Sequence, residues 1–506
     1  MNNSKGIKNL IWGIVAQTVT IGLGIIIPRL VLVNLGSESN GLLNSVHSIL
    51  SYMTLLEAGV GTATLQALYK PFADDDKNSI NQIMAATNYF YKRTGFIYLL
   101  IVLSLSVGYT FLVNTTLPKI YVFLVVILSG LSGVISYFFQ GKFRIFLSAE
   151  GKSYLITNIN TITTVGISVF KALLLIAGGN VVLIQTVYFV FNLVQMLFIV
   201  IYMHKRYPWI DLKAQPNFDA LSQKKAVMVH QISSLIFYNT DNIILTALAS
   251  LKVVSVYSMY AMIFGMVKSV AITFSDSFLY ALGQSYSDKK KFLRLFNAYE
   301  VYNMSITFAL FCVAGILITP FLKLYTAGVN DINYIDGVVV LLFIAYYLLD
   351  NGRKSSLTVI NIAQHFDKTK WRAILEAAIN LVFSIVLTIK FGIYGVLLGT
   401  IAALLYRTND AIIYASKLLK RSALITYRRW ILNIGLFVLF FVVATQLDLV
   451  FDSYASLFVY GIVLCCIIIP SFVGINSLFE PNTAKYAFTV IKNLVKNKFF
   501  SRRKQL

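Results

Sequence analysis

The sequence predicts an all-α, polytopic membrane protein with about 14 transmembrane helices, each needing about 20 apolar residues. Of its 506 residues, 58% are hydrophobic and only 13% are charged. A water-soluble protein of this composition would expose large apolar patches. The apolar runs are long rather than short and alternating, and backbone groups in hydrocarbon cannot bond to water. Helices are therefore the predicted spanning structure.

The apolar runs divide the chain into two lobes of six helices and a C-terminal pair. In the N-lobe (1–203), helices are predicted near 10–33, 41–62, 94–113, 120–141, 153–177 and 181–203. A polar interlobe loop (204–225) follows. In the C-lobe (226–416), helices are predicted near 226–249, 254–280, 297–324, 335–352, 373–389 and 393–416. The remainder comprises two helices within 417–481, near 430–447 and 455–476, and a basic interfacial tail at 482–506.

The positive charges support this arrangement. Lys and Arg total 43 against 21 Asp and Glu, and short cytoplasmic loops normally carry such an excess. With a cytoplasmic N-terminus, the outer segments hold only Arg29, Lys119, Lys252, Lys323 and Lys390, and the spans hold Lys171, Lys268 and Arg407. All other cations are cytoplasmic, so both termini are predicted to face the cytoplasm. The basic excess indicates topology and attraction to anionic membrane lipids rather than nucleic-acid binding.

A weak internal repeat predicts that the two lobes are pseudo-symmetric. Residues 41–77 align without gaps to residues 255–291, and both stretches end in Ala-Leu followed by a polar loop. Six helices separate the copies, so both copies enter the membrane from the same side. Two such lobes are expected to enclose a cleft.

Ionisable residues inside the predicted spans are the candidate functional residues, because each costs at least about 2.5–3.5 kcal/mol in a bilayer centre. They are Glu57, Asp241, Lys268, Asp350, and Arg407 with Asp410. Arg407 and Asp410 are three residues apart, which favours an intrahelical ion pair over a ligand site.

Four residues are predicted to bind substrate or line the cavity: Arg29, Glu57, Asp241 and Lys268. In the repeat Glu57 aligns with Ala271, and Lys268 precedes Ala271 by three residues on nearly the same helix face. Glu57 and Lys268 are therefore expected to face each other across the cleft, with Lys268 available to an anion or, alternatively, engaged in a structural pair joining the lobes. Arg29 is either a gate or a side chain reaching the outer interface. Asp241 is predicted to line the cavity.

The sequence predicts no catalytic residue, cofactor or metal site. The three cysteines, Cys312, Cys465 and Cys466, lie in apolar runs without metal-ligand spacing. Walker A, HExxH and GxSxG motifs are absent, so hydrolysis of ATP by this chain is excluded. The prediction is a protein that is not an enzyme.

Four segments resemble a known family: IPRLVLVNLGSESNGLLN from Ile27, LLEAGVGTATLQALYK from Leu55, LSAEGKSYLITN from Leu147 and YNTDNIILTALASLKVVSVYSMY from Tyr238. In this order they are similar to the polysaccharide transporter branch of the multidrug/oligosaccharidyl-lipid/polysaccharide (MOP) exporter superfamily, the Wzx-type flippases. The resemblance implies alternating access in a bacterial cell membrane and outward movement of an undecaprenyl-pyrophosphate-linked oligosaccharide. It implies that Arg29 and Lys268 meet the pyrophosphate, and it suggests a glycan polymerase and assembly proteins as partners.

Several readings stay open. Glu57 or Asp241 is the candidate group for coupling to H⁺ or Na⁺. A multidrug or cation exporter of the same superfamily is the main alternative function. A lipid II flippase and a membrane glycan polymerase are further alternatives, and the short predicted outer loops count against the polymerase.

Overall fold

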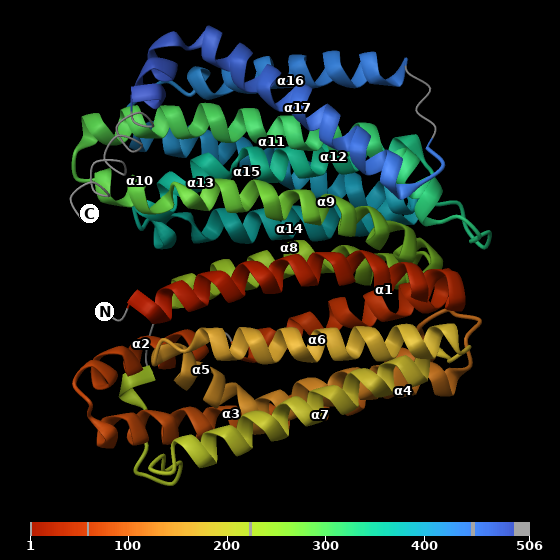
Figure 1. The fold of residues 1–506 in the computed structure, drawn as a ribbon, viewed down its shortest axis with the longest axis vertical. Helices are drawn as coiled ribbons and strands as arrows, with labels where there is room; N and C mark the ends of the chain where they lie inside the picture. The colour runs from red at the N-terminus through yellow and green to blue at the C-terminus, as the bar shows by residue number, and fades with distance from the viewer. Residues whose placement is uncertain (1–2, 58–59, 222–224, 447–450, 490–506) are drawn as a thin grey trace, which may run out of the picture. The chain divides into compact units, whose positions relative to one another are not determined.

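The computed structural model describes residues 3–57, 60–221, 225–446 and 451–489, and no strand occurs among them (Figure 1). The all-α prediction is confirmed. The α-helices are α1 (Asn3–Ser51), α2 (Val60–Ala73), α3 (Lys77–Leu112), α4 (Lys119–Ile135), α5 (Gly141–Ala149), α6 (Ser153–Ile176), α7 (Val181–Arg206), α8 (Lys225–Leu248), α9 (Leu251–Ser277), α10 (Leu279–Ser285), α11 (Lys289–Tyr325), α12 (Gly337–Gly352), α13 (Lys354–Ile362), α14 (Phe366–Phe391), α15 (Ile393–Leu418), α16 (Leu424–Thr445) and α17 (Tyr454–Phe479). Shorter elements are 3-10 helices at Tyr52–Glu57 and Asp219–Leu221 and a π-helix at Ser136–Gln140.

Helix contacts divide the chain into two compact units. Unit 1 comprises Met1–Ser258 and Gly328–Asn333, and unit 2 comprises Met259–Ala327 and Tyr334–Leu506. Figure 1 shows α3, α4, α7 and α6 running side by side in unit 1, and α11, α12, α15 and α14 doing so in unit 2. Helix α8 packs against α1 in unit 1, although the sequence assigned it to the C-lobe. The lobe boundary at 204–225 therefore stays a prediction.

Eleven helical segments of the described residues are long and apolar enough to cross a membrane, and the chain is a multi-pass membrane protein. One of them, Thr18–Glu57, contains most of the first predicted span and most of the second. The first and second predicted spans are separated by a kink at Gly36, whose φ of 78° is a conformation that glycine adopts without strain. Two further predicted runs, 226–249 and 335–352, correspond to α8 and α12, which lie outside this set of eleven.

The turn at Gly36 is fixed by a residue far along the chain. The backbone N–H and hydroxyl of Ser37 donate to the Asp331 carboxylate at 3.0 and 2.6 Å. A carboxylate in this position caps the start of the second half of α1, where backbone N–H groups have no partner within the helix itself. Asp331 belongs to the short second segment of unit 1.

The internal repeat has structural counterparts in each unit. Leu68 in α2 and its repeat partner Leu282 in α10 are both 0% exposed. Acidic caps follow both: the Asp76 carboxylate accepts from the N–H of Ser79, and Asp288 caps α11. These caps explain why α3 and α11 begin at 77 and 289, well before the predicted starts at 94 and 297.

Ion pairs attach the last two helices to the rest of unit 2. The buried Glu300 carboxylate of α11 accepts from Arg421 at 2.6 Å and from Arg429 of α16. Arg429 in turn lies 2.6 Å from Glu480, directly after α17. Residues 482–489 of the predicted tail are helical, and the rest of that tail lies outside the described residues.

Candidate functional site

Lys268, the predicted anion-binding residue, forms an ion pair inside unit 2. Its ammonium lies 2.6 Å from the Asp350 carboxylate, which joins α9 to the end of α12. The Lys268 ammonium also lies 6.0 Å from the centre of the Tyr347 ring. The Lys268 side chain is 20% exposed and that of Asp350 only 3%. Lys268 is therefore the accessible member of the pair.

Asp350 has a second cationic partner, Arg353. The Arg353 guanidinium donates to Asp350 at 2.8 Å and to Glu376 of α14 at 2.5 Å. Its side chain is 6% exposed, and buried charges of this kind are stable only when they are paired. Arg353 therefore connects the end of α12 to α14.

The pairing continues from Glu376 onto α15. Arg407 lies 3.4 Å from Glu376 and 2.5 Å from Asp410, so the predicted intrahelical pair of Arg407 and Asp410 is confirmed. Asp410 also accepts from Arg372 of α14, a partner that the sequence did not suggest. The contacts tie α14 to α15 at two places.

Together these seven residues form one continuous charge network: Lys268, Asp350, Arg353, Glu376, Arg407, Asp410 and Arg372. It contains four cations and three carboxylates, an excess of one positive charge. The two most exposed cations lie at its ends, Lys268 at 20% and Arg372 at 34%, while the middle is buried. The network can thus offer a cation at either end without exposing its centre.

Glu57 lies in unit 1 at the end of a 3-10 turn, and a tyrosine hydroxyl donates a hydrogen bond to its carboxylate. The hydroxyl of Tyr91 on α3 donates to the Glu57 carboxylate. Arg144 of α5 attracts the same carboxylate electrostatically, but its guanidinium hydrogen bonds go to Gln140 and Asn160. The absence of a side chain at Gly61 leaves room, because a Cβ there would lie 2.9 Å from Glu57 Oε1.

Asp241 in α8 is 2% exposed and accepts from the Tyr257 hydroxyl at 2.7 Å. The residues on either side of Asp241 in the sequence join α8 to α1 and to the 3-10 helix Tyr52–Glu57. Thr240 and the Tyr52 hydroxyl lie 2.5 Å apart, and Asn242 donates to Ser48 at 2.8 Å. Polar groups of α8 thus pack against protein within unit 1.

Of the four predicted site residues, the structure places Arg29, Glu57 and Asp241 in unit 1 and Lys268 in unit 2. Arg29 is half-buried in α1, directly after Pro28. Glu57 and Lys268 each have a partner inside their own unit, and their approach across a cleft stays a prediction.

Sequence reasoning missed Arg353, Glu376 and Arg372 as members of the network. Glu376 is the fourth residue of the predicted span 373–389, and Arg353 directly follows the span 335–352. Charges so near predicted ends are ordinarily assigned to the membrane interface. Among the described residues, no cluster of three or more His, Cys, Asp or Glu side chains could hold a metal ion.

No family model and no curated protein matches the sequence. Solved structures do match at 14% identity. The lipid II flippase MurJ, in an inward closed conformation, has a TM-score of 0.64 and covers 94% of this chain and 99% of its own. An inward-facing multidrug resistance MATE family transporter of the MOP superfamily has a TM-score of 0.61 and covers 80% of this chain and 94% of its own. The chain therefore has the fold that MurJ shares with the MATE transporters of the MOP superfamily.

Proposed function

We propose that this protein is a flippase that moves an undecaprenyl-pyrophosphate-linked oligosaccharide from the cytoplasmic to the outer leaflet of a bacterial cell membrane. It acts by alternating access, with both termini in the cytoplasm. The reaction breaks and forms no covalent bond, so the protein needs no catalytic residue. A pyrophosphate and hydrated sugars cannot cross hydrocarbon unaided, whereas the polyprenyl chain can remain in the lipid throughout.

The observation that carries this proposal is the accessible, replaceable ammonium of Lys268. Asp350 is held by both Lys268 and Arg353, and so it keeps one cationic partner when Lys268 turns toward a substrate. Leaving a buried carboxylate without any partner would be strongly unfavourable. A lysine side chain is a flexible point charge and suits this exchange better than a fixed guanidinium. Lys268 therefore receives the pyrophosphate, and Arg29 meets it near the outer end of the path.

The extent of the fold similarity supports a lipid-linked substrate over a drug. The lipid II flippase MurJ matches 94% of this chain, whereas the inward-facing MATE transporter matches 80%. MurJ thus matches a larger part of this chain than the MATE transporter does. The last two helices of the chain are joined to α11 by ion pairs. The excess positive charge of the network also suits an anionic head group rather than a cationic drug.

Coupling to H⁺ or Na⁺ through Glu57 or Asp241 is part of the proposal. The hydroxyl of Tyr91 donates to Glu57 and that of Tyr257 to Asp241. Each of these carboxylates thus accepts from a neutral hydroxyl, and carboxylates within membrane spans commonly take part in proton or cation coupling. Transport in vesicles should therefore fall when both ion gradients are collapsed, and unchanged transport would contradict coupling.

Three variants test the role of Lys268. Lys268→Ala should reduce transport of the lipid-linked oligosaccharide into the outer leaflet of proteoliposomes at least tenfold, with normal amounts of folded protein. Lys268→Arg should keep part of the activity because it keeps the charge. The control is Lys354→Ala, which removes a lysine of the same unit from an exposed pair with Asp276. Full transport by folded Lys268→Ala would reject the binding role.

Deleting the gene identifies the substrate class. The lipid-linked oligosaccharide should accumulate in the cytoplasmic leaflet, where its sugars can be determined by mass spectrometry. Surface glycan that is restored when the gene is re-expressed supports the flippase function. Surface glycan that stays absent when the Lys268→Ala variant is expressed connects the phenotype to the charge network. Sensitivity to cationic drugs without any change in surface glycan would instead support an exporter.

A further inference from the structure

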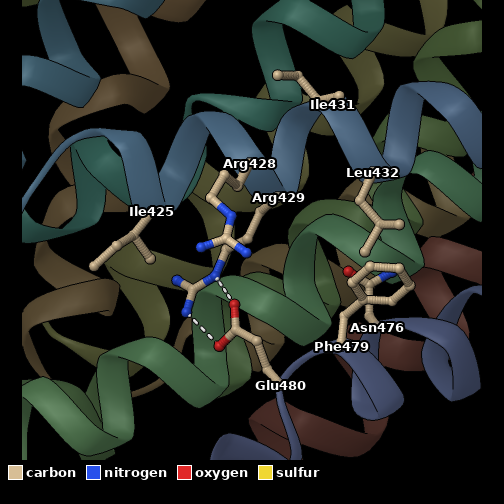
Figure 2. Close-up of a pocket in the computed structure, with 8 residues that line it drawn as sticks. All are labelled: Ile425, Arg428, Arg429, Ile431, Leu432, Asn476, Phe479 and Glu480. Carbon is tan, nitrogen blue, oxygen red and sulfur yellow. Dashed lines mark hydrogen bonds and ion pairs between the residues drawn. The ribbon is translucent and has the colours of Figure 1, made fainter.

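A cavity of about 430 Å³ lies between α16 and α17, the two helices whose role the sequence leaves unexplained (Figure 2). Both helices belong to unit 2 and are candidate membrane spans. The cavity begins within the first turns of α16. Its lining residues are Ile425, Arg428, Arg429, Ile431, Leu432, Asn476, Phe479 and Glu480.

Arg429 is already fully engaged. Its Nε and Nη2 atoms donate to the two oxygens of Glu480 at 2.6 and 2.7 Å, the pair drawn as dashed lines in Figure 2. Its third nitrogen donates to Glu300. Burial alone would raise the pKa of Glu480, but the hydrogen bonds and charge of Arg429 outweigh it and keep that pKa below its usual value. Glu480 therefore stays ionised and keeps Arg429 in place.

Arg428, unlike Arg429, is available to a ligand. Its side chain is exposed, it lines the same cavity, and it makes no ion pair with any described residue. Guanidinium groups fit phosphate oxygens with two parallel hydrogen bonds. In the described part of the chain around the cavity, Arg421 and Arg429 pair with Glu300 and Glu480, and Arg428 adds one positive charge.

We propose that this cavity binds an anionic phospholipid of the surrounding membrane, distinct from the transported substrate. Its phosphate contacts Arg428, and an acyl chain lies along Ile431, Leu432 and Phe479. Arg428 is the fifth residue of the candidate span that begins at Leu424, the depth at which lipid head groups meet a helix. Anionic lipids are concentrated in the cytoplasmic leaflet, where the charge distribution places this end of α16.

Two other cavities in unit 2 provide the contrast. One of about 250 Å³ lies between α9, α11 and α17, and one of about 510 Å³ lies near the end of α17. No charged residue lines either of them. Selection for an anionic head group is thus expected at the α16 and α17 cavity and not at these two.

Native mass spectrometry of the purified full chain tests the proposal by titration with phosphatidylglycerol or phosphatidylcholine in detergent. The native protein should bind phosphatidylglycerol more tightly. Arg428→Ala should weaken phosphatidylglycerol binding roughly fivefold and leave phosphatidylcholine binding unchanged. The matched control, Arg294→Ala, removes another exposed arginine of unit 2 and should have no effect.

A second pair of variants tests the cavity itself. Leu432→Trp should fill it and weaken phosphatidylglycerol binding, while Ile434→Trp, at an exposed position of α16 outside the lining, should not. Equal affinity for the two lipids, or equal losses in Arg428→Ala and Arg294→Ala, would overturn the proposal. So would one-for-one displacement of phosphatidylglycerol by undecaprenyl pyrophosphate, because the site would then belong to the substrate.

Discussion

Carboxylates of the predicted membrane spans accept from different kinds of donor in the two units. In unit 1, tyrosine hydroxyls donate to Glu57 and Asp241. In unit 2, Asp350 and Glu376 each lie between two cations. Neutral hydroxyls thus contribute to stabilising the two carboxylates of unit 1, and ion pairs stabilise the two carboxylates of unit 2.

The kind of donor beside a carboxylate determines which role the carboxylate can have. A carboxylate beside neutral donors can take up a proton without leaving a cation unpaired. A carboxylate between two cations stays charged and fixes the helices that supply them. This difference agrees with the proposed function, in which Glu57 or Asp241 of unit 1 couples transport to an ion gradient and Lys268 of unit 2 meets the anionic substrate.

The largest expected effect is at the centre of the unit 2 network. Arg353→Met removes one partner from both Asp350 and Glu376 and should lower the free energy of unfolding by about 3–5 kcal/mol. Thermal unfolding in detergent, with the amount of monodisperse protein, measures the loss. Lys354→Met, which affects a much more exposed pair, is the control. Equal stability of the two variants would show that the charge network does not stabilise the fold.

A smaller effect is expected where unit 1 depends on close approach rather than charge. A Cβ at Gly41 would lie 1.8 Å from the backbone oxygen of Leu251, so Gly41→Ala forces the backbone to move. The expected loss is about 1–3 kcal/mol of unfolding free energy. Gly108→Ala, a helical glycine with no neighbour within 4 Å of the added atom, should be neutral or stabilising in the same unfolding measurement.

The smallest expected change in stability is at Glu57. In Glu57→Gln the amide oxygen can still accept from the Tyr91 hydroxyl, so the loss should be only about 1 kcal/mol. Transport driven by an ion gradient should nevertheless fall in Glu57→Gln, whereas gradient-independent exchange should persist. A loss of stability as large as that of Arg353→Met would remove the distinction between the two units.

Most of the fold was predictable because long apolar runs leave the chain few alternatives to membrane-spanning helices. The helix starts at 77 and 289 were missed because polar first turns lie outside the apolar signal. The partner of Lys268 was not predictable either. Asp350 follows Lys268 by 82 residues, and one sequence does not reveal which helices meet. The pair of Arg407 and Asp410 was predictable because it lies within one helix turn.

The hydrogen bonds between Ser37 and Asp331 join residues 294 positions apart. During synthesis, Asp331 therefore becomes available to Ser37 only after α9 and α11 have been made. The two halves of α1 can enter the membrane early, yet the turn at Gly36 acquires these hydrogen bonds only late. Completion of unit 1 thus depends on a segment that is synthesised only after the first helices of unit 2.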